Sequence, residues 1–205
     1  KVPKEEREAT MAYICDKWVR LTAPMIPHVS EEFWSKMDRD GYVSLAPWPK
    51  ADRRLTDPSV EMAQQVVEAT VKDIREIAKL LKDKKASDVH IYVAPQWMFK
   101  AMNSIRTDKV SLIVGDIMKY LMSNPDYRKY GKQVKNIVDR IAKENGLWDH
   151  SKSAKDEMSV LKDSAEYISS EIGMKVTVHS AMKPEYDPQN KAKFALPGRV
   201  SLYLE

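Results

Sequence analysis

The sequence is poor in the residues that build disulfides and phosphate-binding loops. It holds a single cysteine, Cys15, so no disulfide can form within the chain, and we expect a reducing compartment, the cytoplasm. Its six glycines form neither a G-x-x-x-x-G-K-S/T nor a G-x-G-x-x-G loop, which excludes the common nucleotide-phosphate cradles. No apolar run approaches the roughly 18 residues of a membrane span, and no hydrophobic signal core stands near the N-terminus. We therefore expect no membrane partner.

Reactive side chains are also scarce. The four histidines, His28, His90, His150 and His179, do not stand at the spacing of metal ligands. Cys15 falls on the apolar side of a predicted helix, which favours a packed core thiol over a nucleophile. His28 stands beside a proline at a helix start, which favours a structural role over a ligand or a base. We predict no catalytic residue, no cofactor-binding residue and no metal site in this chain.

What the sequence does contain is the composition of a folded, soluble protein. Of its 205 residues, 31% are charged and 43% are hydrophobic, a balance that disordered chains do not have. The net charge of +4 says little about partners, but residues 119–143 carry seven basic and two acidic side chains. This local excess favours a polyanionic partner. The chain opens on a helical pattern without an initiator methionine, so we expect it to be part of a longer polypeptide.

The pattern over residues 1–85 predicts an all-α helix bundle. Helices are expected over 4–22, over 28–38 and from Asp57-Pro58 to about Lys84, with a crossing loop over 39–58. Apolar side chains recur at helical spacing, which places them on the buried face of the first and the long helix. They are Met11, Ile14, Cys15, Trp18 and Leu21, and then Ala63, Val67, Thr70, Ile74, Ile77 and Leu81.

The pattern over residues 86–205 predicts a small α+β domain that begins after a boundary at Lys84-Lys85-Ala86-Ser87. Alternation around Val89, Ile91 and Val93 indicates a strand. Further strands are expected over 175–180 and 199–205, and helices over 96–104, 108–122, 126–145 and 153–172. The predicted fold class is therefore α+β, an N-terminal all-α helix bundle followed by a small α+β domain with a short sheet.

The tryptophans allow both a packing and a stacking interpretation. Trp18 and Trp34 fall on apolar helix faces, which favours core packing over base-stacking platforms. Trp48, between two prolines, is interpreted as a plug that closes the helix bundle, with stacking as the alternative. Trp97 and Trp148 are expected to anchor the core of the second domain.

One run in the second domain is the best candidate for contact with a nucleic acid. Basic side chains there interleave with Tyr127 and Tyr130, so that phosphate contacts and stacking are both available. The alternative is an ordinary solvated helix face. The predicted RNA-binding residues of this run are Arg128, Lys129, Lys132 and Lys135.

Residues 21–34 are the most informative stretch of the chain. They follow the pattern L-x-x-P-x-x-P-H-x-x-E-E-x-W, and the segment Leu45-Ala46-Pro47-Trp48-Pro49 comes shortly after them. This pattern resembles the helix-bundle anticodon-binding domain of class I aminoacyl-tRNA synthetases, of the leucyl, isoleucyl and valyl group. The segments 89–97 (VHIYVAPQW) and 184–199 (PEYDPQNKAKFALPGR) are similar to the C-terminal region of archaeal and eukaryotic-type leucyl-tRNA synthetases.

The resemblance implies a partner and a division of labour. The partner would be leucine tRNA, with residues 1–85 against the tRNA body and the second domain at the long variable arm. The HIGH and KMSKS signatures of the catalytic domain are absent, so ATP and Mg would be bound by the full-length enzyme and not by this fragment. The fragment would work beside the catalytic and editing domains of the same polypeptide, as an inactive part of a leucine-tRNA ligase.

The end of the chain is the second predicted RNA contact. A Pro197-Gly198 turn would hold a basic loop against a terminal strand, near the tip of the variable arm in the family resembled. An edge strand that only closes the sheet is the alternative. The predicted residues are Lys191, Lys193, Arg199 and Tyr203.

Two rival functions stay open from the sequence. The same region of an isoleucyl- or valyl-tRNA synthetase would keep an RNA partner but change the amino acid. A helical protein-interaction module would have no RNA role, and the near-balanced charge of residues 1–118 favours it. Salt-dependent binding of leucine tRNA discriminates between these possibilities.

Overall fold

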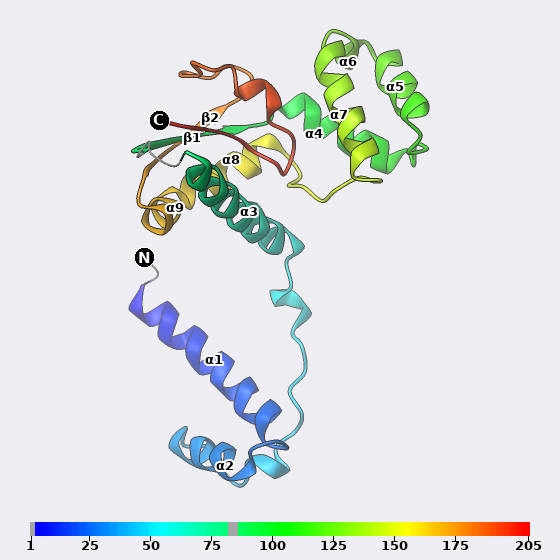
Figure 1. Ribbon diagram of the computed structural model, residues 1–205. Helices are drawn as coiled ribbons and strands as arrows, with labels where there is room; N and C mark the ends of the chain where they lie inside the picture. Colours follow the sequence, from blue (N-terminus) through cyan, green and yellow to red (C-terminus); the bar gives the residue numbers. More distant parts are fainter. Residues whose placement is uncertain (1–2, 82–85) are drawn as a thin grey trace. The chain divides into compact units, whose positions relative to one another are not determined.

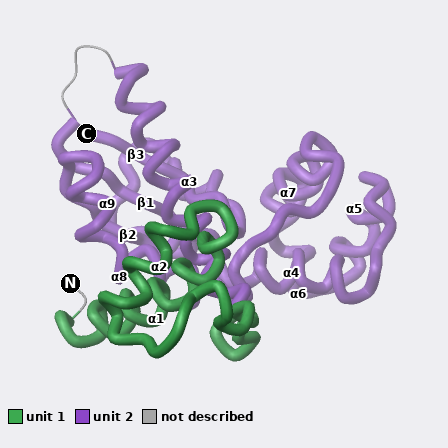
Figure 2. The backbone as a smooth tube through the Cα atoms, turned by 90° about the horizontal axis from the view of Figure 1, so that it is seen from below, with its two compact units in different colours: residues 1–56 green, residues 57–205 purple. Residues whose placement is uncertain are grey.

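The computed structural model describes residues 3–81 and 86–205 of the chain (Figure 1). It divides into two compact units, Lys1–Thr56 and Asp57–Glu205, which are coloured separately in Figure 2. The mixture of helices with a small three-stranded sheet confirms the α+β class. None of the described helices combines the length and apolarity needed to cross a lipid bilayer.

The first unit consists of two helices and the turns that follow them. Helix α1 spans Lys4–Thr22, and α2 spans Pro27–Lys36, with the proline in its first turn as expected. Two short 3₁₀ turns, η1 (Val43–Leu45) and η2 (Arg53–Leu55), lie in the predicted crossing loop. The carboxylate of Glu31 accepts hydrogen bonds from the backbone N–H groups of Val43 (2.9 Å) and Ser44 (3.3 Å), which ties the loop to α2.

The core of the first unit is small. It comprises Val19, Ala23, Trp34 and Val43, so the predicted burial of Trp34 is confirmed. The predicted burial of Trp18 is wrong, because α2 covers only part of the apolar side of α1 and leaves this side chain 65% exposed. Met11, Ile14 and Leu21 are exposed on the same helix, and Cys15 is half-buried. Trp48 is 61% exposed, so it closes no core within this unit.

The second unit begins with the long helix α3, Pro58–Leu80. The Asp57 side chain accepts a hydrogen bond from the N–H of Ser59 (2.9 Å), which caps the helix start. The predicted stripe is buried at its centre, where Val67, Thr70 and Ile74 pack together with Val66 and Val71. The last residues of the predicted helix, 82–84, lie outside the described residues.

A mixed sheet with strand order β2-β1-β3 forms the centre of the second unit. Strand β1 (Asp88–Val93) pairs in parallel with β2 (Lys175–Ser180) and antiparallel with β3 (Ser201–Leu204). The helices α3, α8 (Ala154–Asp163) and α9 (Ala165–Ile172) pack on one face of this sheet (Figure 1). Alternation then places the other strand residues, among them His90 and Tyr92, on the opposite face.

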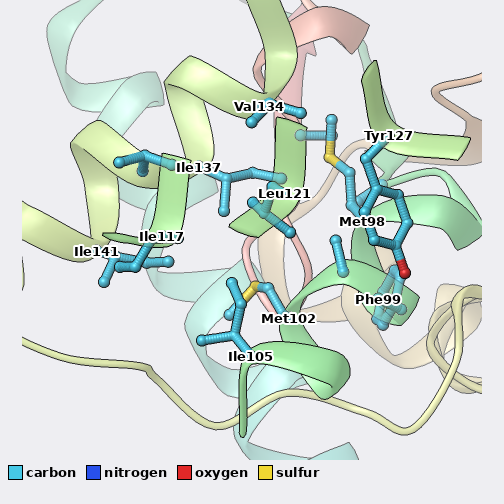
Figure 3. Packing of buried hydrophobic residues seen from close by; sticks show 14 of the residues in the cluster. Met98, Phe99, Met102, Ile105, Ile117, Leu121, Tyr127, Val134, Ile137 and Ile141 are labelled. Carbon is cyan, nitrogen blue, oxygen red and sulfur yellow. The ribbon is translucent and has the colours of Figure 1, made fainter. Parts of the chain in front are cut away.

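A second hydrophobic cluster joins Tyr92 of the sheet to four helices. These are α4 (Gln96–Thr107), α5 (Val114–Ser123), α6 (Pro125–Arg128) and α7 (Gly131–Lys143). Figure 3 shows apolar side chains of α4, α5 and α7 meeting around Leu121.

Two helices that the sequence predicts as continuous are each broken into two. One break lies between α6 and α7, and the other between α8 and α9. The predicted helix start at residue 108 is also wrong, because Lys109 has a positive φ of 49° and α5 begins at Val114.

The division between compact units differs from the predicted domain boundary at residue 85. The reason is the side-chain packing of α3, whose apolar stripe packs with Val89, Leu161 and Ile168 and so places the helix in the second unit. Amphipathic periodicity indicates that a helix has a buried face, but does not indicate which element covers it. Lys84 and Lys85, at the predicted boundary itself, lie outside the described residues.

Candidate nucleic-acid interface

The predicted basic run lies on the outer side of α6 and α7. Arg128 ends α6, Lys129 follows it, and Lys132 and Lys135 lie in the first turns of α7. All four side chains are exposed. No carboxylate in the part of the chain that the structure describes lies within 4.0 Å of them, whereas Arg140 further along α7 pairs with Glu144 at 2.9 Å. Four cations without counter-charges form a local positive surface, as a phosphate partner requires.

The opposite side of α7 holds this surface in place. Val134, Ile137, Val138 and Ile141 are fully buried and pack in the cluster with Leu121 (Figure 3). Because residues three and four apart share a helix face, this packing fixes the direction in which Lys132 and Lys135 point. The core of the second unit therefore holds Lys132 and Lys135 on the exposed side of α7, and Arg128 and Lys129 lie exposed just before them in the chain.

The two tyrosines of the run have different environments. Tyr127 is 8% exposed and packs in the cluster drawn in Figure 3, so its ring belongs to the core. Tyr130 is half-buried, and its ring lies parallel to that of Trp97, with 4.4 Å between centroids and 7° between planes. Trp97 contributes to the second core as predicted, but its stacking on Tyr130 could not be read from the sequence.

The C-terminal candidates lie in different environments. Lys193 is exposed beside Phe194, and Lys191 is half-buried next to it, where its backbone N–H donates to Asp187 (2.7 Å). Arg199 pairs with Glu144 at 3.2 Å, and its guanidinium lies 5.4 Å from the centroid of the Trp148 ring. Arg199 is thus already engaged by two groups of the second unit, unlike Arg128, Lys132 and Lys135 of the α6–α7 surface.

The terminal turn and strand follow the prediction closely. Leu196 and Arg199 exchange backbone hydrogen bonds of 2.8 and 2.9 Å around Pro197-Gly198, so the predicted turn is confirmed. Leu202 is buried in the cluster below the sheet. Tyr203 is half-buried on the other face, with its ring centroid 6.0 Å from that of His90.

Sequence reasoning missed a polar network around His90 on this sheet face. The His90 ring lies within hydrogen-bond distance of His179 (Nδ1 to Nε2, 3.0 Å) and of Glu205 (Nε2 to Oε1, 3.4 Å). The Tyr186 hydroxyl donates to Glu205 (2.7 Å), which raises the pKa of Tyr186 to about 12. Burial, and then the neighbouring His90, lower the pKa of His179. The available signal was the alternation that sets His90, His179 and Tyr203 on one face.

Comparison with known proteins shows what this chain is similar to. Residues 2–93 match the family model described as "Anticodon-binding domain of tRNA ligase". Over 97% of its length the chain is 37% identical to a leucine–tRNA ligase of Methanosarcina barkeri. Leucine–tRNA ligases of Methanothermobacter thermautotrophicus and Pyrococcus abyssi are 36% and 30% identical, each over 98% of this chain.

The matches define the extent of the similarity. The chain spans 20–21% of the length of these three relatives, about a fifth. Residues 2–93 match the anticodon-binding domain of tRNA ligases, so the resemblance predicted from the sequence is confirmed.

Proposed function

We propose that this chain is the tRNA-docking part of a cytoplasmic leucyl-tRNA synthetase. The observation that supports this most directly is the exposed, unpaired positive surface of Arg128, Lys129, Lys132 and Lys135, on a chain similar to leucine–tRNA ligases over nearly its whole length. Aminoacylation itself would take place in catalytic and editing domains of the same polypeptide. ATP and Mg²⁺ would bind in those domains.

The proposed contact is of the kind that duplex RNA allows. An A-form arm presents phosphates and a shallow minor groove, so a protein recognises it by shape and backbone contacts rather than by reading base edges. Exposed cations without ion-pair partners among the described residues, two of them held on one side of α7, suit such a partner. The long variable arm of leucine tRNA is the proposed site of contact for the second unit.

The direct test compares tRNA species. The 205-residue chain is titrated with leucine, isoleucine and valine tRNAs, and with leucine tRNA whose variable arm has been shortened. We expect preference for leucine tRNA and loss of that preference with the shortened arm. Preference for isoleucine or valine tRNA would favour the corresponding alternative, and equal binding of all four RNAs would indicate only a general RNA affinity. Absence of salt-dependent binding would favour a protein-interaction module.

Neutralising the α6–α7 surface should flatten the salt dependence of binding. With Arg128, Lys129, Lys132 and Lys135 all changed to Gln, the slope of log affinity against log salt should fall by about 0.7–0.9 for each phosphate contact removed. The measurement is a titration with leucine tRNA at several salt concentrations.

A matched control removes the same charge elsewhere in the second unit. It changes four exposed lysines on or beside α8 and at the start of β2 to Gln and should keep the slope of the wild-type chain. If both variants lose the same slope, the effect comes from net charge and not from this face. The control residues are Lys152, Lys155, Lys162 and Lys175.

The C-terminal candidates should affect the choice of tRNA. Changing Lys191 and Lys193 to Gln and Tyr203 to Leu should lower the preference for leucine tRNA over other tRNAs with long arms. Point changes are preferable to truncation, because the Glu205 carbonyl accepts from the N–H of Asp88 (3.0 Å) and so holds the sheet edge. If the folded triple variant keeps the preference, this end only closes the sheet.

A further inference from the structure

Beside the positive α6–α7 surface lies a pair of aromatic rings whose packing is incomplete. Trp97, in the first turn of α4, and Tyr130, just before α7, are both half-buried and stacked in parallel at 4.4 Å. On Tyr130, the Lys129 ammonium lies 5.1 Å from the ring centroid. Buried Tyr127 supports the pair, with its centroid 6.4 Å from that of Trp97. The two rings are thus rigidly placed but still partly open to solvent.

The polar atoms of the two rings are also unused. Trp148 donates its indole N–H to the Pro197 carbonyl (2.6 Å), and Tyr92 donates its hydroxyl to the Tyr186 carbonyl (2.9 Å). By contrast, neither the Trp97 indole N–H nor the Tyr130 hydroxyl makes a hydrogen bond to any residue within 3–81 or 86–205. Amphipathic rings that are partly exposed and carry free donors serve recognition rather than core packing alone.

The neighbouring charges indicate the class of ligand. Stacked aromatics next to unpaired cations are the combination by which proteins bind unpaired nucleotides, since rings stack on bases while lysines contact phosphates. A duplex hides its base faces, so a stacking contact requires a base outside the helix. Lys129 can move from the Tyr130 ring to a phosphate. A base then stacks on the ring in place of the ammonium, so that one favourable contact replaces another.

We infer that Trp97 and Tyr130 form a stacking site for an unpaired RNA base, flanked by phosphate contacts from Lys129 and Lys132. The inference rests on the proposed tRNA-binding function and deepens it, because it adds a contact whose strength does not depend on charge. The paired part of the RNA would lie along the positive surface, and a loop or bulge base would lie on the ring pair.

The test separates stacking from charge at one position. Tyr130→Leu removes the aromatic ring but keeps an apolar side chain of comparable size, and Tyr130→Phe keeps the ring. Stacking on an aromatic side chain contributes about 1–3 kcal/mol per base, so the Leu variant should bind leucine tRNA roughly fivefold or more weakly. The Phe variant should bind within about twofold of the wild-type chain. Both should keep the wild-type salt slope, because neither changes a charge.

The outcomes distinguish this site from the proposed function. If the fourfold charge variant loses salt slope while a folded Tyr130→Leu variant binds like the wild-type chain, the stacking site is wrong and tRNA docking stands. If no variant changes binding, this whole face is not the interface. Equal weakening by Leu and Phe would assign the effect to the hydroxyl and overturn stacking.

A second measurement needs no variant and covers the case in which Tyr130→Leu does not fold. Ultraviolet irradiation of the wild-type chain with leucine tRNA crosslinks bases to the aromatic side chains they stack on. Peptide mapping should find the crosslink at Trp97 or Tyr130. Crosslinks confined to other peptides would overturn the inference.

Discussion

Replacing Trp34 by Ala should lower the free energy of unfolding of the first unit by about 3–5 kcal/mol. The side chain is 8% exposed and is the largest member of a core that otherwise comprises Val19, Ala23 and Val43. Its indole N–H also donates to the Asp40 carbonyl (3.3 Å), so truncation removes a hydrogen bond as well as packing. Urea unfolding of the 205-residue chain, followed by far-ultraviolet circular dichroism, measures the change.

Trp18 is a matched control for this prediction. It is the same residue type, in the same unit, and its helix also has an apolar side, but its side chain is 65% exposed. Trp18→Ala should change the free energy of unfolding by no more than about 0.5 kcal/mol, as is usual for surface positions. Equal destabilisation by the two changes would show that the apolar side of α1 is covered in solution.

The two tryptophans also show what the sequence could and could not predict. Helical spacing places both on apolar faces, and this local pattern correctly predicted the helices that carry them. Whether a face is covered depends on elements elsewhere in the chain, which periodicity does not contain. The same limit explains α3, whose buried stripe was predicted but whose partners, α8, α9 and the sheet, were not.

The candidate site was predictable to the same degree. The basic run was visible as a local excess of charge, and all four of its cations are exposed in the structure. The run could not reveal that Tyr127 packs inward while Tyr130 stacks on Trp97, because that contact joins α4 to the connection between α6 and α7, which is distant in sequence. The break after Arg128 was also missed, and it is this break that places Tyr130 ahead of α7.

A buried carboxyl group beneath the C-terminal turn leads to the second large prediction. Glu157 of α8 is fully buried; its Oε2 accepts from the N–H of Gly198 (2.8 Å), and its Oε1 has no partner among the described residues. Gly198 has a φ of +71°, and a Cβ there would lie 2.9 Å from the Asp149 carbonyl oxygen. The turn that precedes Arg199 therefore rests on Glu157 at a position where only glycine fits.

The sign of the pH dependence follows from the environment of Glu157. Burial raises the pKa of its carboxyl group to about 7, against the opposing effect of the Gly198 N–H. The folded state thus keeps a proton that the unfolded chain releases near its ordinary value of 4.5. The stability contributed by this group is fully present below about pH 4.5 and is lost as the pH rises through 7. At about 1.4 kcal/mol per unit, the loss reaches roughly 3 kcal/mol.

Glu157→Gln should therefore stabilise the second unit at pH 8 by roughly 2–3 kcal/mol and have little effect near pH 4.5. An amide oxygen can still accept from Gly198, but an amide carries no charge to bury. Urea unfolding at the two pH values gives the difference in free energy of unfolding between variant and wild-type chain. The titration of groups that both chains share, such as His150 and His179, cancels in this difference.

The exposed Glu76→Gln is the control and should shift the free energy of unfolding by about 0.5 kcal/mol or less at both pH values. If Glu157→Gln destabilises the chain equally at pH 4.5 and pH 8, the carboxyl group holds the turn in its ionised form. The anchor of the segment that carries Arg199 would then be a charge rather than a neutral hydrogen bond.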